Sequence, residues 1–480
     1  DTLNGVAVTT ANTDVTPVTT GSIRIDADGN ITIQPGTPSG TYTIPYTICE
    51  TGATPVNCKT ANITVEVKND LLAKDDNLGT IATSTTATTV AGSVLANNGN
   101  GSDTLNGVAV TTANTDVTPV TTGSIRIDAD GNVTIQPGTP SGTYTIPYTI
   151  CETGATPVNC KTANIIVEVK NVIDAIDDAK VTVASGGNTP NVTLNDKLNG
   201  SNVTIGAAAG QVSLAGVNVP AGLTLNADGT ITVGATTPSG TYQVEYQICE
   251  NGATPVNCDK AIAIVEVKNE LVAKNDNLGI VATSATTSTA AGSVLVNNNG
   301  NGADTLNGVA VTTANTDVTP VTTGPIRIDA DGNVTIEPGT PSGTYTIPYT
   351  ICETGATPAN CKTADVIVEV KNELVAKNDN LGIVATSATT STAAGSVLVN
   401  NNGNGADTLN GVAVTTANTD VIPVTTGPIR IDADGNVTIE PGTPSGTYTI
   451  PYTICETGAT PANCKTADVI VEVKNELVAK

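Results

Sequence analysis

Ten cysteines are the residues best placed to react with one another, and they fall in five pairs nine residues apart. Each pair encloses nearly the same segment, ETGATPVN, ENGATPVN or ETGATPAN. The Gly and Pro of this segment favour a loop between two strands, which would bring the two cysteines face to face. The spacing therefore predicts five disulfides: Cys49–Cys58, Cys151–Cys160, Cys249–Cys258, Cys352–Cys361 and Cys455–Cys464.

Two other chemistries compete for these cysteines. A zinc site usually needs four ligands, and one pair per repeat in a chain with no His is too few. Free buried thiols are the other alternative. Disulfides would place the chain in an oxidising compartment outside the cytosol. Closing so short a loop adds only about 2–3 kcal/mol, so each bond is expected to clip one hairpin and not to create the fold.

Catalytic groupings are scarce. Without His, neither a Ser-His-Asp nor a Cys-His arrangement can form in these 480 residues. Asp26 and Asp28 could suggest acid–base chemistry, but they stand in an Asp-Ala-Asp-Gly turn. A related segment further along the chain has Asn226 in place of the first Asp. Turn formation explains them better. We therefore expect no enzyme activity.

Calcium is the cofactor that the acidic residues suggest, because hard cations bind several oxygens at once. Carboxylates gather where one repeat would meet the next, and ions there would fix the angle between neighbours. The alternative is a solvated acidic linker whose residues cap turns. The candidate ligands are Asp70, Asp75, Asp76, Asp174, Asp177, Asp178, Glu270, Asp276, Glu373 and Asp379.

The composition favours strands and several small cores. Val, Ile, Thr, Gly, Ala and Asn dominate, and the only aromatic residues are 10 Tyr. The net charge of −25 argues against nucleic-acid binding, which needs a basic face. No apolar run reaches the roughly 18 residues of a membrane span.

The chain repeats itself about every hundred residues, the length of one immunoglobulin-like domain. The segment DTLNGVAVTTANTDV begins at Asp1, Asp103, Asp304 and Asp407, and successive ICE cysteines lie 102, 98, 103 and 103 residues apart. We predict a partial repeat at 1–70 that lacks its first strands, repeats at 71–172, 173–270 (diverged), 271–373 and 374–476, and the start of another at 477–480. A frame shifted by a few strands is the alternative.

Alternating patterns define the strands within each repeat. Ile23 and Ile25 precede a tight turn, and Ile31 and Ile33 follow it, which predicts a β-hairpin. Further alternating segments predict the last two strands of the repeat, one on each side of the loop between the cysteines. The fold class predicted is all-β, with tandem antiparallel immunoglobulin-like β-sandwiches of about seven strands each arranged as an extended rod. Tyr42, after Pro-Ser-Gly-Thr, either forms a tyrosine corner or simply fills the core.

The motif order AKDDN, GSVLANN, DTLNGVAV, ADGNVTI, TPSGTYTIPYTIC and TANITVEV resembles bacterial cadherin-like and immunoglobulin-like adhesin repeats. The YTICE…NC hairpin is similar to that of the giant SprB-type gliding-motility adhesins of Bacteroidetes, which the type IX system exports. In many such repeats a VLAND…DGD stretch binds calcium, but residues 94–101 carry amides instead of acids here. The resemblance also implies O-glycosylation after Asp, on exposed loops, at Thr2, Thr104, Thr305 and Thr408.

Together these features predict a repetitive extracellular stalk of a cell-surface adhesin, a mechanical tether for attachment or gliding motility. The resemblance implies a cell-surface, outer-membrane-associated location. It also implies partners in the secretion and motility machinery, and a surface or glycan ligand bound by regions outside this stretch. The alternative is a structural subunit of an extracellular filament or surface layer. Pro45, assigned to an edge strand, argues against open-ended strand pairing. A carbohydrate-binding array is disfavoured because Trp and Phe are absent.

Overall fold

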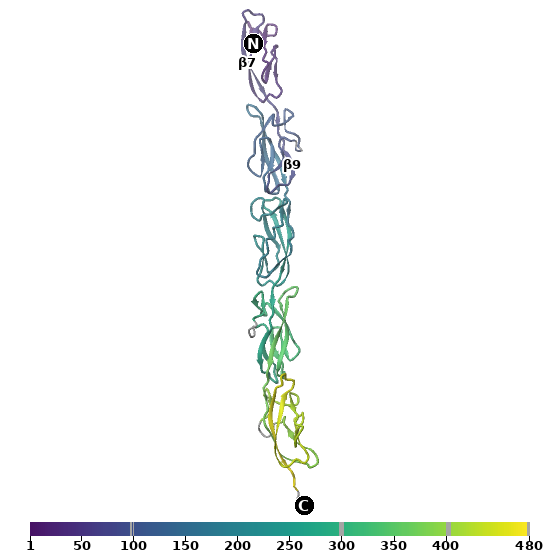
Figure 1. Ribbon diagram of the computed structural model, residues 1–480. Helices are drawn as coiled ribbons and strands as arrows, with labels where there is room; N and C mark the ends of the chain where they lie inside the picture. The colour runs from purple at the N-terminus through teal and green to yellow at the C-terminus, as the bar shows by residue number, and fades with distance from the viewer. Residues whose placement is uncertain (97, 99, 297–301, 400–404, 478–480) are drawn as a thin grey trace. The chain divides into compact units, whose positions relative to one another are not determined.

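The computed structural model describes residues 1–96, 98, 100–296, 302–399 and 405–477. Over these residues the chain consists of strands and loops with no helix, which confirms the all-β prediction (Figure 1). The chain divides into two compact units. The first comprises residues 1–180, 189–231 and 243–264, and the second comprises residues 181–188, 232–242 and 265–480.

The second repeat has ten strands. They are β8 (Leu71–Leu72), β9 (Asp76–Ile81), β10 (Thr89–Ser93), β11 (Thr104–Leu105), β12 (Val108–Ala109), β13 (Thr115–Val117), β14 (Ile125–Ile127), β15 (Asn132–Ile135), β16 (Gly142–Glu152) and β17 (Cys160–Val169). One sheet has the order β13-β16-β17-β9 and another the order β10-β15-β14, while β12-β11-β8 form a third, small sheet. The number of strands exceeds the predicted seven because three of them are two-residue pairings around the linker.

The other repeats follow this order, except that the first has no described strands equivalent to β8, β9 and β10 and the third has an isolated bridge, Asn188 with Thr232, in place of β10. The first has β1 (Thr2–Leu3), β2 (Val6–Ala7), β3 (Thr13–Thr16), β4 (Ile23–Ile25), β5 (Ile31–Ile33), β6 (Gly40–Glu50) and β7 (Cys58–Val67). The third has β18 (Ile173–Asp174), β19 (Val181–Val183), β20 (Lys197–Leu198), β21 (Ser201–Asn202), β22 (Val212–Asn218), β23 (Leu223–Leu225), β24 (Ile231–Val233), β25 (Gly240–Glu250) and β26 (Cys258–Val267).

The fourth repeat comprises β27 (Leu271–Val272), β28 (Asp276–Val281), β29 (Thr289–Ser293), β30 (Thr305–Leu306), β31 (Val309–Ala310), β32 (Thr316–Thr319), β33 (Ile326–Ile328), β34 (Asn333–Ile336), β35 (Gly343–Glu353) and β36 (Cys361–Val370). The fifth comprises β37 (Leu374–Val375), β38 (Asp379–Ala385), β39 (Thr392–Ser396), β40 (Thr408–Leu409), β41 (Val412–Ala413), β42 (Thr419–Ile422), β43 (Ile429–Ile431), β44 (Asn436–Ile439), β45 (Gly446–Glu456) and β46 (Cys464–Lys474). Pairing within these ranges agrees with the proposed repeat frame, whose boundaries stay a prediction.

Alternation along the strands builds an aliphatic core in each complete repeat. The predicted hairpin forms, with Ile23 opposite Ile33 across the turn. In the second repeat the equivalent Ile125 and Ile135 are fully buried and share one cluster with Ile150 and Ile165 of the other sheet. In the first repeat, where no described strand covers β5, Ile33 is 47% exposed. Each core therefore depends on strands from both ends of its repeat.

One pairing in each of the second to fifth repeats departs from the predicted antiparallel sandwich, because an early strand runs parallel to the last one. In the second repeat β9 runs parallel to β17, with Asp76 opposite Ile165 and Ile81 opposite Val169. The physical reason is the tandem arrangement. In a tandem array the chain enters each repeat at one end and leaves it at the opposite end. The first long strand and the last one therefore run in the same direction.

The assignment of Pro45 to an edge strand is wrong. β6 is the central strand of the order β3-β6-β7, and Pro45 lies opposite Asn62 of β7. The partner on the other side pairs only with Thr47–Glu50, so the missing N–H of Pro45 faces no ladder. In the third repeat Glu245 stands at this position, and β22 extends far enough to pair with it.

Candidate functional site

The linker between the first two repeats is centred on Asn69, which is hydrogen-bonded to both of them. Its backbone N–H donates to Ser39 Oγ (2.9 Å), and its side-chain amide donates to the carbonyl oxygen of Thr37 (2.9 Å). Its Oδ1 accepts from Asn106 Nδ2 (2.8 Å), and its carbonyl oxygen accepts from Asn159 Nδ2 (3.2 Å). Since Thr37 and Asn106 lie in neighbouring repeats, this one residue bonds to both.

Glu152 completes the arrangement from the second repeat. Its carboxylate accepts from Ser39 N (2.9 Å), Ser39 Oγ (2.6 Å), Asn69 Nδ2 (2.5 Å) and Asn159 Nδ2 (2.8 Å), although the residue is only 5% exposed. Burial alone would raise the pKa of Glu152, but the hydrogen bonds from Asn159, Ser39 and Asn69 outweigh it and lower that pKa below 4.5. The group is therefore an ionised carboxylate with four donors, a strong form of hydrogen bonding.

We call Ser39, Asn69, Glu152 and Asn159 the junction clamp. The same four residue types meet at each later junction, and the hydroxyl-to-carboxylate distances are 2.7, 2.6 and 2.6 Å. Every clamp lies within one of the two compact units. The later clamps are Ser141/Asn171/Glu250/Asn257, Ser239/Asn269/Glu353/Asn360 and Ser342/Asn372/Glu456/Asn463.

In the second to fifth repeats the loop between the two cysteines carries the clamp carboxylate onto the preceding repeat. In the loop 152–159, Thr156 N donates to the carbonyl oxygen of Ser39 (2.9 Å), and Gly40 forms an isolated parallel bridge with Thr156. A Cβ added to Gly40 would lie 3.1 Å from the Thr156 carbonyl oxygen, so a larger residue would push the loop away. The Thr156–Pro157 peptide bond is cis.

Five disulfides close these loops: Cys49–Cys58, Cys151–Cys160, Cys249–Cys258, Cys352–Cys361 and Cys455–Cys464. The paired residues stand directly opposite one another at the end of the last hairpin, with Cα atoms 4.0–4.1 Å apart. In the second to fifth repeats the disulfide directly adjoins the clamp Glu and the clamp Asn of its own repeat, whereas Cys49–Cys58 adjoins Glu50 and Asn57, which belong to none of these clamps.

Four of the predicted calcium ligands lie instead beside a buried tyrosine. The Tyr148 hydroxyl is 2.9 Å from Asp76 Oδ2 and 2.9 Å from Asp103 Oδ2. One hydroxyl proton cannot serve both carboxylates, and burial raises the pKa of Asp76 to about 6 and also raises that of Asp103. Asp276 and Asp379 contact their tyrosines in the same way. Burial, with repulsion from Asp196, raises the pKa of Asp178 to about 7.

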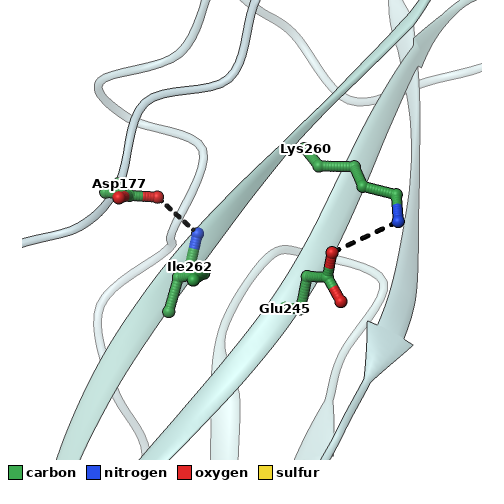
Figure 2. A network of polar contacts seen from close by, with 4 residues as sticks. All are labelled: Asp177, Glu245, Lys260 and Ile262. Carbon is green, nitrogen blue, oxygen red and sulfur yellow. Dashed lines mark hydrogen bonds and ion pairs between the residues drawn. The ribbon is translucent and has the colours of Figure 1, made fainter.

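The remaining predicted ligands are separate from these. Asp75 and Asp177 accept backbone N–H groups of the last strand, from Asn164 (2.7 Å) and Ile262 (2.8 Å; Figure 2). Near Asp177, the Lys260 ammonium forms an ion pair with Glu245 at 3.2 Å. Glu245 stands where the first repeat has Pro45. The side chains of the last group are exposed on the linkers: Asp70, Asp174, Glu270 and Glu373.

These carboxylates do not fit a shared calcium ion. The acids of one junction divide into an exposed linker group, a group that accepts backbone N–H, and a group bound to tyrosine. No three or more acidic, His or Cys side chains of the described ranges come together as a metal site. Asp75 and Asp177 accept backbone N–H groups and Asp76 is hydrogen-bonded to Tyr148, whereas calcium needs six to eight oxygen ligands around one ion.

The predicted glycosylation sites lie in short strands and not in loops, and only Thr2, in β1, is exposed among these four. Thr104, Thr305 and Thr408 are half-buried in the two-residue strands β11, β30 and β40. The preceding Asp103 is buried against Tyr148. The loop expectation failed because it rested on composition, and pairing with the linker strand covers these residues.

Sequence reasoning missed the clamp. In every repeat a Glu follows the first cysteine and an Asn precedes the second, as Glu152 and Asn159 do, and a Ser-Gly pair like Ser39-Gly40 stands at the start of the long strand. The recurrence of these residues is the sequence signal for the clamp. Of the two roles that the sequence offers for Tyr42, the structure shows the tyrosine corner, with the Tyr42 hydroxyl donating to the Pro38 carbonyl oxygen at 2.8 Å. Of the stretch 94–101, Asn97 and Gly99 lie outside the described residues.

The fold and this recurring site define a protein of tandem all-β repeats. No described helix is long and apolar enough to cross a membrane. No protein-family model matches the chain, and no curated protein does.

Solved cadherin structures are similar at low scores. Cadherin domains 1–5 of protocadherin gamma B2 are 12% identical, with 97% of this chain and 94% of that one covered and a TM-score of 0.22. Drosophila N-cadherin EC1-4 is 11% identical, with 84% and 100% covered and a TM-score of 0.21. Mouse cadherin-23 EC22-24 is 13% identical, with 64% and 97% covered and a TM-score of 0.20.

Proposed function

We propose that this chain is the repetitive extracellular stalk of a cell-surface adhesin, a mechanical tether built of immunoglobulin-like sandwiches. The observation that carries the proposal is the junction clamp, which recurs at four junctions with the same residues and nearly the same distances. A flexible string of domains needs no such contact. A tether that limits bending between neighbours does.

The polar groups support a mechanical role rather than a catalytic one. The clamp carboxylate is fully occupied by Ser and Asn donors of the chain itself, and the buried Asp pairs are bonded to tyrosine. The disulfides support an oxidising, extracellular setting.

The resemblance of the repeat motifs extends the proposal to a bacterial cell. It adds attachment or gliding motility, outer-membrane association, export by the type IX system, and a surface or glycan ligand bound by other parts of the protein. Calcium is not part of this proposal, because the acidic side chains do not converge.

Electron microscopy of intact producing cells, labelled with an antibody raised against the repeats, tests this role. Single fibres that leave the cell surface are expected for an adhesin stalk. Ordered lattices or bundles of chains would contradict it and favour the filament or surface-layer alternative.

A further inference from the structure

We infer that the disulfide in each repeat serves as a redox-sensitive control of the docking between repeats and not as a support of its own sandwich. The inference deepens the proposed function and rests on it, because coupling between repeats matters only if the chain bears load. The geometry of the second repeat carries the argument.

The hairpin needs no covalent bond to hold its strands. β16 and β17 pair over ten consecutive positions, from Gly142 opposite Val169 to Cys151 opposite Cys160. Its core residues Ile150 and Val167 are fully buried within that ladder. The disulfide lies at the very end of the ladder, where Cys151 and Cys160 are only half-buried.

The loop beyond the disulfide makes its contacts with the neighbour. Glu152, next to Cys151, reaches Ser39, and Asn159, next to Cys160, reaches the Asn69 carbonyl oxygen. Glu152 N also donates to the Asn159 carbonyl oxygen at 2.9 Å. The two clamp residues therefore keep their relative positions as long as the two ends of the loop stay together. Docking an eight-residue loop is entropically easier when its ends are fixed beforehand.

The chemistry is a thiol–disulfide exchange with a dithiol reductant, for example an exported dithiol oxidoreductase. The reductant gives two electrons and two protons, the Cys151–Cys160 S–S bond breaks to leave two thiols, and the reductant becomes a disulfide. We expect the loop to open, the clamp to weaken, and both sandwiches to stay folded.

The test measures hydrogen exchange of the Ser39 amide by NMR in the full 480-residue chain. This amide is a suitable reporter because it donates to Glu152 Oε1 of the next repeat. The variant Cys151→Ser/Cys160→Ser removes the bond in the neighbouring repeat. The matched control, Cys49→Ser/Cys58→Ser, removes the disulfide of the repeat that contains Ser39.

The variant Cys151→Ser/Cys160→Ser should speed exchange of the Ser39 amide about tenfold or more and leave the exchange rates of the core amides of Ile150 and Val167 unchanged. The control variant should leave the exchange rate of the Ser39 amide unchanged. Dithiothreitol should act likewise at Ser141, Ser239 and Ser342. Faster exchange of the core amides, an effect of the control alone, or no effect of the neighbour variant would overturn the inference. If Ser39 is unprotected in the oxidised parent, the docking itself fails, and with it the proposed function.

Discussion

Glu152 accepts hydrogen bonds from both the backbone N–H and the hydroxyl of Ser39, which precedes it by 113 residues. Two donors from one residue fix a carboxylate in both position and orientation. With Asn69 and Asn159 as further donors, no carboxylate lone pair needs water at this junction. Neighbouring repeats are thus joined by a small buried polar network in addition to a linker of only a few residues.

Replacing the clamp carboxylate by an amide should weaken the junction. In Glu152→Gln the charge is lost and an NH₂ group faces donors, and hydrogen bonds to a charged group are worth about 1.5–3 kcal/mol. We expect Ser39 exchange to rise by about one order of magnitude in NMR measurements. Glu50→Gln is the matched control, since the Glu50 carboxylate accepts from Asn57 of its own loop and from no described residue of another repeat. Equal exchange in both variants would argue against the clamp.

The glycine at the docking strand offers a steric test. A Cβ on Gly343 would lie 3.1 Å from the Thr460 carbonyl oxygen, whereas one on Gly446 meets no atom within 4 Å. Gly343→Ala should therefore displace the loop of the fifth repeat and cost about 1–2 kcal/mol of junction stability. Gly446→Ala should be neutral. Exchange of the Ser342 amide measures both, and a loss in the Gly446 variant alone would refute the assignment.

The tyrosine-bound carboxylates predict repeats that are most stable in mild acid. Asp76 has a pKa of about 6 in the folded chain against an ordinary 3.8, so the folded state holds its proton more tightly. The resulting stabilisation is full below about pH 3.8 and is lost as the pH rises through 6. At about 1.4 kcal/mol per pKa unit, it reaches at most about 3 kcal/mol for Asp76.

Calorimetry of the full chain between pH 5 and 8 should show Tm rising as the pH falls. Asp76→Asn should flatten the profile of the second repeat, whereas Asp130→Asn, in an exposed turn, should leave it unchanged. The clamp acts in the opposite direction: the lowered pKa of Glu152 means that its stabilisation is present above pH 4.5 and lost in stronger acid. A Tm that rises steadily from pH 5 to 8 would contradict the Asp76 assignment.

Removal of calcium should leave the stability unchanged. A ligand that binds only the folded state raises Tm in proportion to its occupancy, and the separated carboxylates offer no shared site. We expect equal melting temperatures in EDTA and in millimolar calcium, measured by calorimetry on the full chain. A higher Tm in calcium, abolished by Asp276→Asn, would restore the junction-calcium hypothesis.

The sequence was informative where the physics is local. Alternation at Ile23, Ile25, Ile31 and Ile33 predicts a hairpin because neighbouring residues decide it, and the cysteine spacing predicts opposite positions at a hairpin end. The parallel pairing of β9 with β17 depends on where the chain enters and leaves a repeat, which no local pattern encodes. The partner of Glu152 is equally remote in the sequence: recurrence beside the cysteines marks this Glu, but no local pattern identifies Ser39, 113 residues earlier, as its partner.

The most direct measurement of the central claim compares small-angle X-ray scattering of the oxidised parent chain with that of Glu152→Gln/Glu250→Gln/Glu353→Gln/Glu456→Gln. If the clamps hold neighbouring repeats in line, the parent has the larger radius of gyration, and the variant contracts toward a flexible string while its circular dichroism is unchanged. Superimposable scattering curves would contradict the account.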